Sequence, residues 1–549
     1  MTNKLIAIVI LVCFFGSVQA QDYTFQNSDI ISSIQFEDGL LGTTQNSQRP
    51  VSLGNHSGKL GLSYNFQPQT SIDIFGSFAR RRWEMSAITT TAYSGNVSPI
   101  QRDLLMGNET NTTTQHNISI HAQHKFKQGH TLIADYDYLN FSIENPTRYR
   151  LKDFSENGQQ LSTQTFETTK ETPFNFHIAQ LAYQSILNDK LNVDAGVKAI
   201  LSQVKNNTAL LDENGSPSSN PLFTDEMDLA EQIYAAYVSI EGSVNSRYSF
   251  SAGVRYDYSN LELVAAQGNV NRQISRLFPT LSITRSFSEF QKLTLAYRER
   301  ISRPSFQNLA PAFFFLNPYT LLTGNIQALP NLNRTVEATF NHQSFFAAFS
   351  YSHDNAPIVR FAIPQLNQED NLLLLISDNI ENRQQVGLNM GFPVAFTKFW
   401  NSRYAIGSYW RRDKVRFDES TFIESNPIIS VDVSQSFQFF QDWSLELSGR
   451  LNSRTYQGTI YQPQQLFVNF GIQKKFKNGT LGLSWSDIFN SGSFLGFVNE
   501  LPSQGVVYDW NYDIEGSIVK LSYSYNFGKQ QMKKLRSSRA SDVLQRFNN

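Results

Sequence analysis

Eight charged residues of this 549-residue sequence stand in four pairs, and the members of each pair are two or four positions apart. On an extended strand, residues two apart share a face, so each group would point to one side of its strand. Charges gathered on one side can set the field along a water-filled passage, and hence its preference for ions or solutes. They can also form internal salt bridges that hold strands together, or hold loops folded against them. The eight residues are Asp135, Asp137, Arg255, Asp257, Arg298, Arg300, Glu446 and Arg450.

Metal and nucleophilic chemistry have little support in the sequence. His116, His121, His124 and His130 form one cluster, but His121 and His124 would point to opposite faces of a strand, and no carboxylate stands beside them at ligand spacing. The sequence contains no G-x-S-x-G nucleophile motif and no glycine-rich phosphate loop. Its single cysteine, Cys13, excludes a disulfide framework and a cysteine-ligated zinc site. We therefore expect no catalytic residues, no metal and no cofactor.

The composition narrows the class of protein. The chain is 40% hydrophobic, 17% charged and 13% aromatic, with a net charge of −1. So many aromatic residues exclude a disordered chain, and the near-neutral charge argues against nucleic acid as the main partner. Outside the extreme N-terminus, no uninterrupted apolar run reaches 18 residues, which argues against a helical membrane protein.

The elements that would position the charged groups are strands. From residue 57 onward, apolar and polar residues alternate in segment after segment, and no sustained 3.6-residue apolar pattern competes. The alternation is clearest in residues 191–201, 248–259 and 519–527, where aromatic and aliphatic residues alternate with small, polar or charged ones. The sequence therefore predicts an all-β chain.

The connections between these segments alternate in length, with short polar turns such as residues 67–69 and 477–479 between long loops rich in Asn, Ser and Thr. This pattern is typical of a transmembrane antiparallel β-barrel, which has short periplasmic turns and long extracellular loops. Only a closed barrel pairs every backbone group of a sheet inside hydrocarbon. We predict about 18–20 strands, with 22 as the upper limit. The predicted long loops are residues 87–112, 145–174, 206–228, 304–331, 353–381 and 490–515.

A set of soluble β-sandwiches would also show alternation. However, many of these segments exceed the five or six residues usual in soluble sheets, and their polar face is rich in hydrogen-bonding groups. Ordinary bacterial barrels close with an even number of strands. If residues 66 and 527 both lie at the periplasmic face, the count of visible strands is odd. We therefore expect an additional strand within residues 21–56, around residues 29–36.

The two ends of the chain differ from the rest in composition. Residues 1–20 combine a cationic start at Lys4, a short apolar run and small residues before a cleavage point after Ala20, which predicts a signal peptide and an exported protein. We expect residues 21–56 to form a short N-terminal segment and residues 57–527 to form the barrel. Residues 528–549 carry six Lys or Arg residues against one Asp, and we expect a solvated, basic periplasmic tail.

One stretch carries a family resemblance. Residues 297–331 read YRERISRPSFQNLAPAFFFLNPYTLLTGNIQALPN, with the successive motifs RISRP, NLAP, NPYT and GNIQALP. With further matches spread from residue 59 to the C-terminus, this stretch resembles the TonB-dependent-receptor-like outer-membrane β-barrel family common in Bacteroidota. The resemblance implies an outer-membrane location. It also implies a closing strand, from Val519 to Phe527, that the barrel-assembly machinery recognises.

The chain departs from the fuller members of that family, which carry a carboxypeptidase-regulatory-like β-sandwich and a plug domain before the barrel. Residues 21–56 are too few to form a plug domain, and no convincing TonB box stands there. We therefore expect a barrel without these two domains. Energised import, which acts by pulling on the plug, is not carried over.

The apolar loop segment Ala312-Phe313-Phe314-Phe315-Leu316 has two interpretations. Exposed apolar patches often mark a binding surface. Alternatively, a segment held between Pro311 and Pro318 has a fixed conformation and tucks against the barrel rim or into the lumen. We favour the second interpretation.

The sequence thus predicts a non-enzymatic outer-membrane barrel, surrounded by membrane lipid, that passes or binds an unknown solute and has no nucleic-acid partner. One form is a passive or gated pore narrowed by its own loops. Another is a receptor-like barrel whose plug is supplied by another chain. A different class stays open, namely a non-transporting surface protein such as an adhesin or a barrel that docks a surface lipoprotein.

Overall fold

The computed structural model of the chain describes residues 17–96, 100–126, 129–218, 223–310, 313–417, 420–457, 460–491, 494–501, 505–514, 516–525, 543–544 and 546. Strands dominate it, with one sheet of 25 strands and a second sheet of four. The helix α1 (Phe306–Leu309) has four residues. Within the described ranges, no helix is long and apolar enough to cross a membrane.

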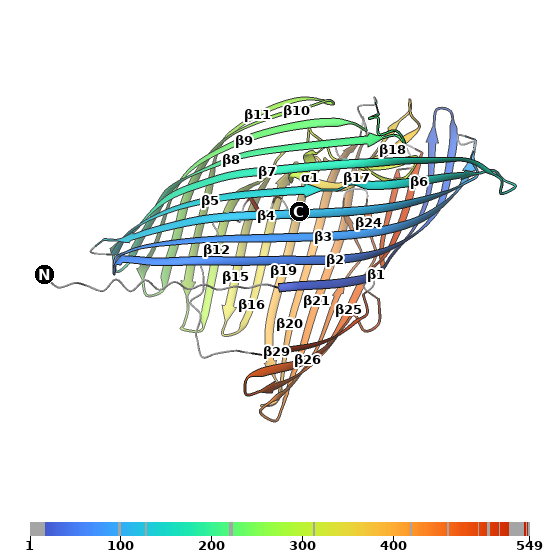
Figure 1. Cartoon of the computed structure of the whole chain (residues 1–549). Helices are drawn as coiled ribbons and strands as arrows, with labels where there is room; N and C mark the ends of the chain where they lie inside the picture. Colours follow the sequence, from blue (N-terminus) through green and yellow to red (C-terminus); the bar gives the residue numbers. More distant parts are fainter. Residues whose placement is uncertain are drawn as a thin grey trace.

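The 25-stranded sheet forms a curved wall in which successive strands pair antiparallel (Figure 1). Its strands are β1 (Ser17–Phe36), β2 (Gly39–Gln67), β3 (Thr70–Gly95), β4 (Arg102–Lys125), β5 (His130–Glu144), β6 (Thr147–Phe154), β7 (Gln160–Asn188), β8 (Leu191–Leu211), β9 (Asp225–Asn245), β10 (Tyr248–Ala265), β11 (Gly268–Ser286), β12 (Gln291–Ser302), β15 (Asn331–His342), β16 (Phe345–Asn355), β19 (Asn382–Ala395), β20 (Trp400–Phe417), β21 (Ser420–Phe439), β22 (Trp443–Asn452), β23 (Thr455–Gln457), β24 (Ile460–Gln462), β25 (Gln465–Phe476), β26 (Gly479–Ser486), β27 (Phe494–Leu501), β28 (Val506–Ile514) and β29 (Ile518–Tyr525).

The wall closes into a barrel. β28 pairs with β1 from Gln26 opposite Ile514 to Ile34 opposite Val506, which joins the end of the sheet to its beginning. Among the 25 described strands, five consecutive pairs each cross the wall once as a single interrupted strand. These pairs are β5/β6, β22/β23, β24/β25, β26/β27 and β28/β29, so the chain crosses the wall 20 times. This even number agrees with the predicted transmembrane barrel of about 18–20 strands.

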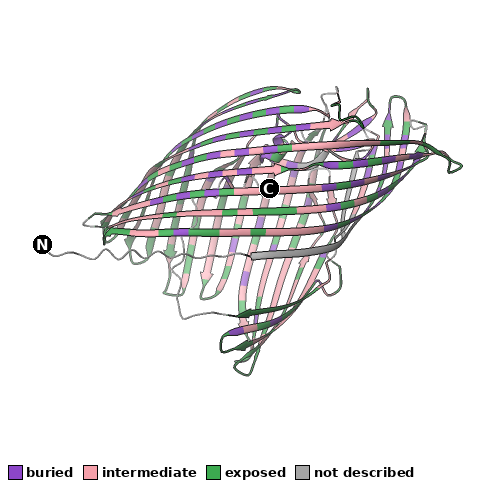
Figure 2. Cartoon of the chain, viewed as in Figure 1, coloured by how far each residue is buried: buried purple, intermediate pink, exposed green. Residues whose placement is uncertain are grey.

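The alternation along the wall reflects two different surroundings. Val197, Leu295 and Phe349 point outward and are each more than half exposed, as residues of a lipid-facing belt should be in a structure without lipid. Asp257, on the opposite face, is 2% exposed. Figure 2 shows buried and exposed residues alternating along the wall strands. The predicted all-β transmembrane barrel is therefore confirmed.

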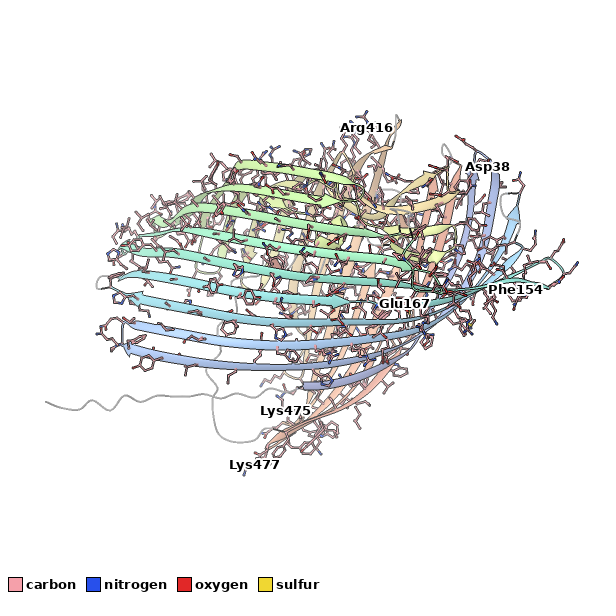
Figure 3. All side chains as sticks on the ribbon, turned by 45° about the horizontal axis from the view of Figure 1, so that its top comes forward. Asp38, Phe154, Glu167, Arg416, Lys475 and Lys477 are labelled. Atoms are coloured by element: carbon pink, nitrogen blue, oxygen red, sulfur yellow. The ribbon has the colours of Figure 1, made fainter. Side chains whose placement is uncertain are left out.

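The wall is taller than a bilayer requires. A transmembrane β-strand needs about 9–11 residues, whereas β2 and β7 each have 29. The structure therefore differs from the sequence analysis in the loops predicted at residues 87–112, 145–174 and 206–228, because most of these residues continue the strands on the outer side of the membrane. In Figure 3, Asp38, Phe154 and Arg416 lie at this outer end, and Lys475 and Lys477 lie at the other.

Strands also begin earlier than residue 57, where the barrel was expected to start. β1 supplies the additional strand expected around residues 29–36, and β2 begins at Gly39. Residues 43–48 alternate between buried and exposed although all six are polar, because this part of the wall faces water instead of lipid. The predicted signal peptide overlaps β1 at residues 17–20, and residues 1–16 lie outside the described ranges.

Two outer loops fold inward as strands. Between β12 and β15 the chain forms α1, β13 (Phe313–Asn317) and β14 (Thr320–Thr323), and between β16 and β19 it forms β17 (Ile358–Asn367) and β18 (Leu372–Asn379). β14 pairs in parallel with β18, so the two loops make one four-stranded sheet, here called the inner sheet. Figure 1 shows α1 and β17 within the outline of the barrel. The sequence analysis expected these residues to be loops.

A buried acid lies in the outer part of the wall. Asp103, at the outer end of β4, is 1% exposed, and its carboxylate accepts a hydrogen bond from the hydroxyl of Tyr93 on β3. Asp153 of β6, also buried, stands opposite Asp103 in the strand register. Burial, helped by the neighbouring charge of Asp153, raises the pKa of Asp103 to about 6.

We predict that replacing Val197 by Lys destabilises the barrel by about 2–4 kcal/mol, because the substitution puts a charge on the lipid-facing side of β8. Asn192→Lys is the control, since Asn192 has the inward parity of the same strand and stands opposite Glu241. The free energy of unfolding in lipid vesicles, measured by urea titration, gives the comparison. An equal loss for both variants would contradict the assignment of lipid to the outward face.

We also predict that the outer ends of β3 and β4 are more stable at pH 5 than at pH 7.5. The folded pKa of Asp103 lies above the unfolded value of about 3.9, so the stabilisation is full below the unfolded value and is lost as the pH rises through about 6. Hydrogen exchange of the amides around Tyr93 and Asp103, corrected for the intrinsic rates, measures the effect. Asp103→Asn should abolish the pH dependence, and Glu156→Gln, at an exposed turn, should retain it. A pH dependence that persists in Asp103→Asn would assign it to another group.

Candidate functional site

The inner sheet occupies the outer part of the lumen. Leu316 and Leu373 pack against residues of β1, β2 and β28, and Val359 and Ile376 pack against Val415 of β20. α1 belongs to a third apolar cluster, which extends along the wall from β5 to β11. Since these contacts reach several sides of the wall, the two loops lie across the outer part of the lumen.

The residues that carry the family resemblance attach the first loop to its surroundings. The buried side chain of Gln45 on β2 donates to the carbonyl of Leu316 (2.9 Å) and accepts from the amide of Asn317 (3.1 Å). The ring of Tyr319 meets that of Tyr93 edge to face, with centroids 5.4 Å apart. The NPYT motif therefore fixes the first loop to the wall.

Gly324 and Asn325, which begin the GNIQALP motif, attach the far end of the first loop. A Cβ added to Gly324 would lie 2.1 Å from the carbonyl oxygen of Ala310, so only glycine fits this close approach to the chain beyond α1. The amide of Asn325 donates to Asp378 of β18 at 2.9 Å, which ties the first loop to the second. The motif thus joins the two loops into one unit.

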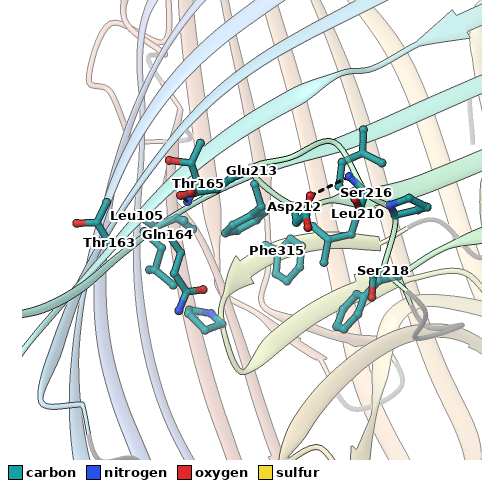
Figure 4. Close-up of a pocket in the computed structure, with 16 residues that line it drawn as sticks. Leu105, Thr163, Gln164, Thr165, Leu210, Asp212, Glu213, Ser216, Ser218 and Phe315 are labelled. Atoms are coloured by element: carbon teal, nitrogen blue, oxygen red, sulfur yellow. Dashed lines mark hydrogen bonds between the residues drawn. The ribbon is translucent and has the colours of Figure 1, made fainter.

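A cavity of about 720 Å³ lies beside the inner sheet, between it and the outer parts of β7 and β8 (Figure 4). Phe315 forms its apolar floor, with ring centroids 5.7 Å from Phe166 and 5.8 Å from Phe223. Thr163, Asp212 and other polar residues line the rest. The favoured interpretation of the phenylalanine-rich segment is therefore confirmed for its described side chains, because Leu316 is 1% exposed and Phe315 packs against the wall.

A cluster of buried charges lies on the β9 and β10 side of the lumen. Glu231 and Asp257 have side chains that are each 3% exposed. Arg303, the second arginine of the RISRP motif, lies 3.8 Å from Glu231 and 3.6 Å from Asp257. Arg255 approaches Asp257 to 2.5 Å on the same strand. The two guanidinium groups of Arg303 and Arg255 thus already balance the charges of the two carboxylates.

The C-terminal residues join this cluster. Arg546 forms an ion pair with Glu231, donates to the carbonyl of Pro304 at 3.0 Å and stacks its guanidinium 4.1 Å from the ring centroid of Phe306. Val543 is 4% exposed within the apolar cluster of α1, and Leu544 packs against that cluster. The prediction of a solvated periplasmic tail is therefore wrong for these residues, and residues 526–542 lie outside the described ranges. These C-terminal residues leave solvent because Val543 and Leu544 bury apolar surface in the cluster of α1, while the same site pairs the charge of Arg546.

Two of the predicted charged residues lie on β5. The carboxylate of Asp135 is 2.5 Å from the imidazole of His121, and both side chains are less than a tenth exposed. Asp137 accepts a hydrogen bond from the hydroxyl of Ser119. The sequence shows no carboxylate at ligand spacing beside His121, but the register of β4 and β5 puts Asp135 directly opposite it.

The remaining predicted residues do not come together at one place. Arg255 and Asp257 belong to the buried cluster described above. Arg298 reaches Glu337 at 3.9 Å, Glu446 accepts a hydrogen bond of 3.2 Å from Ser434, and Arg450 pairs with Asp432 at 2.5 Å. Arg300 is exposed. The structure thus distributes the eight residues over several parts of the wall.

Three residues of the buried cluster escaped the sequence analysis. Glu231 stands two positions from Leu229 and Ile233, which are both buried, so the sequence could predict that it points inward but not which residue it pairs with. Phe306 and Arg546 lie outside regular alternation and left no signal. In the described part of the chain, no group of three or more His, Cys, Asp or Glu residues could hold a metal ion.

Solved structures of similar fold are receptors and transporters. The alcaligin outer-membrane receptor FauA from Bordetella pertussis is 10% identical, with a TM-score of 0.50 over 89% of this chain and 76% of that chain. The ferripyoverdine receptor from Pseudomonas aeruginosa is 10% identical, with a TM-score of 0.54 over 90% and 72%. The copper transporter OprC is 9% identical, with a TM-score of 0.52 over 91% and 81%. At these identities the likeness establishes the fold alone.

Sequence comparison identifies the family. No curated protein matches this sequence. Residues 124–525, well over half of the chain, match the outer membrane protein beta-barrel family. The match agrees with the closed barrel, its lipid-facing belt and the predicted resemblance to TonB-dependent-receptor-like barrels. The chain therefore belongs to the outer membrane protein beta-barrel family and is an integral protein of the outer membrane.

Proposed function

We propose that this protein binds a solute at the outer face of the outer membrane and admits it to a lumen that its own loops keep closed at rest. The supporting observation is the inner sheet, which packs against β1, β2 and β28 on one side and against β20 on another. Residues 1–20 act as the export signal in this proposal. The protein has no enzymatic role in it.

The outer cavity is the proposed solute site. Its volume of about 720 Å³ falls within the range of small-molecule sites, about 300–1,000 Å³. The aromatic floor around Phe315 suits an apolar face, and the polar edge around Thr163 and Ser218 suits hydrogen-bonding groups. We therefore propose a solute with one apolar face and a polar rim. The siderophore and copper cargoes of the similar structures are not transferred, because sequence identity is 9–10%.

We assign the predicted lumen charges to structure instead of selectivity. Apart from the exposed Arg300, each of them has a charged or hydrogen-bonding partner, as described for Asp135, Arg298 and Arg450. Charges held in pairs contribute little net field to a passage. In this proposal they hold neighbouring strands and the inner loops in register.

A non-transporting surface protein is the second candidate. The observation that favours it is the tall outer wall, where strands such as β2 and β7 run well beyond the length that a bilayer needs. Such a wall offers a broad surface to a docking partner, for example a surface lipoprotein. A receptor barrel whose plug comes from another chain is a further form of the transport proposal.

We predict that the wild-type protein conducts poorly in planar bilayers and that Gly324→Ala produces stepwise conductance. The added methyl group collides with the Ala310 carbonyl and displaces the inner loops. Gly471→Ala is the matched control, because a Cβ there meets nothing within 4 Å. A second variant replaces the β17–β18 hairpin by a short Gly-Ser linker and should conduct at least as well. Heat-modifiable migration in electrophoresis verifies that each variant is folded.

Wide, steady conductance by the wild type would contradict the closed lumen. Folded variants of both kinds that stay silent would contradict solute passage and favour the surface protein. Conductance that appears equally in Gly471→Ala would show that the effect is not specific to the inner loops.

A further inference from the structure

The charge cluster around Glu231 has the features of a built site for a guanidinium group. A buried carboxylate, the face of a buried ring and a backbone carbonyl converge on Arg546 from Glu231, Phe306 and Pro304. The ring of Phe306 itself packs against Phe174 edge to face and against Phe176 at a tilt, with centroids 5.7 and 5.6 Å away. A planar cation suits such a combination better than an ammonium, because it can stack and donate in its own plane at once.

The occupant of this site is replaceable without leaving a carboxylate unpaired. Removing one partner of a buried ion pair normally leaves an uncompensated charge. Here Arg303 remains 3.8 Å from Glu231 when Arg546 is absent, and Asp257 keeps both Arg255 and Arg303. With Arg546 the cluster carries three guanidinium groups and two carboxylates; without it the charges balance. The electrostatics therefore favour a site that exchanges its ligand over a permanent anchor.

The chain that leads to the site is long enough to reach it from the periplasmic end. β29 ends at Tyr525, and 17 residues separate it from Val543. At about 3.3–3.6 Å per residue these can span more than 50 Å. Along β9 only 13 residues separate Glu231 from Asn245 at the periplasmic turn, which is less than 50 Å at about 3.4 Å per residue.

We propose that Glu231, Phe306 and the Pro304 carbonyl form an exchangeable guanidinium-binding site in the lumen, occupied in this structure by Arg546 of the chain's own C-terminus. When the tail leaves, the site takes arginine-bearing peptides. Val543 and Leu544 add apolar contacts, so the ligand is a short peptide with aliphatic residues two and three positions before the arginine. This inference does not depend on the outer cavity or on solute passage.

The test uses a fluorescent peptide with the sequence of residues 541–549, SDVLQRFNN, and protein purified in detergent micelles. Fluorescence anisotropy should show binding to a chain that ends at residue 540, and affinity weaker by on the order of tenfold or more for the full-length protein, whose site is filled. Within the truncated chain, Glu231→Gln should weaken binding by a similar factor. Glu226→Gln, an exposed position on the same strand, should leave it unchanged. A peptide with lysine in place of arginine should bind more weakly than the arginine peptide.

A full-length variant keeps the test independent of the truncation. Arg546→Ala should bind the labelled peptide about tenfold more tightly than the wild type, since its own tail has lost the charge-assisted contact. Heat-modifiable migration again verifies folding. The proposal is overturned if the folded truncated protein does not bind the peptide, if Glu231→Gln and Glu226→Gln bind it equally, or if the lysine and arginine peptides bind alike. None of these outcomes bears on the conductance experiment, so the two proposals fail separately.

Discussion

A sheet inside hydrocarbon has no water to satisfy its backbone groups, and the rest of this structure follows from that constraint. β28 must close onto β1, and a wall of 20 passes then encloses more space than its own side chains fill. The chain resolves this by returning two outer loops into the space as the inner sheet. The pairing of backbone groups thus fixes the closed wall, and the inner loops occupy part of the space that this wall encloses.

Prediction from the sequence succeeded where lipid and water face opposite sides of a strand. Between Tyr248 and Tyr258 every second residue meets lipid, so periodicity alone identifies the strand and its inward face. It failed for Thr43 to Gln48, since water and polar contacts surround both faces there. It also failed for β18, whose run of four leucines from Leu372 to Leu375 is buried on both faces and lacks alternation.

Parity predicts the face of a charged residue but not its partner. The inward direction of Asp257 was readable, but Arg303 reaches it from a loop and Arg546 lies far along the chain from Glu231. His121 and Asp135 meet only because of the register between two strands, which no local spacing encodes. The GNIQALP and NPYT motifs indicated a family, and only the structure shows that NPYT fixes the first loop to the wall and that the GN pair ties it to the second loop. Candidate sites built from long-range contacts therefore escape local sequence reasoning even when the fold does not.

The inner loops are attached to the wall by two kinds of contact, apolar packing and polar or ionic pairs, on both sides of the lumen. Toward β1, β2 and β28 the apolar packing of Leu316 and Leu373 is joined by the hydrogen bonds of Gln45, so separation would expose apolar surface to water. Toward β9 and β10 the apolar cluster of α1 is joined by Arg303, which lies between Glu231 and Asp257. Buried ion pairs are a poor source of net stability, because desolvation offsets the attraction, and entering water restores the hydration of each charge. The attachment of the loops toward β9 and β10 therefore rests on the apolar packing of α1 against Leu229 and Leu263, and the ion pairs fix where Arg303 lies.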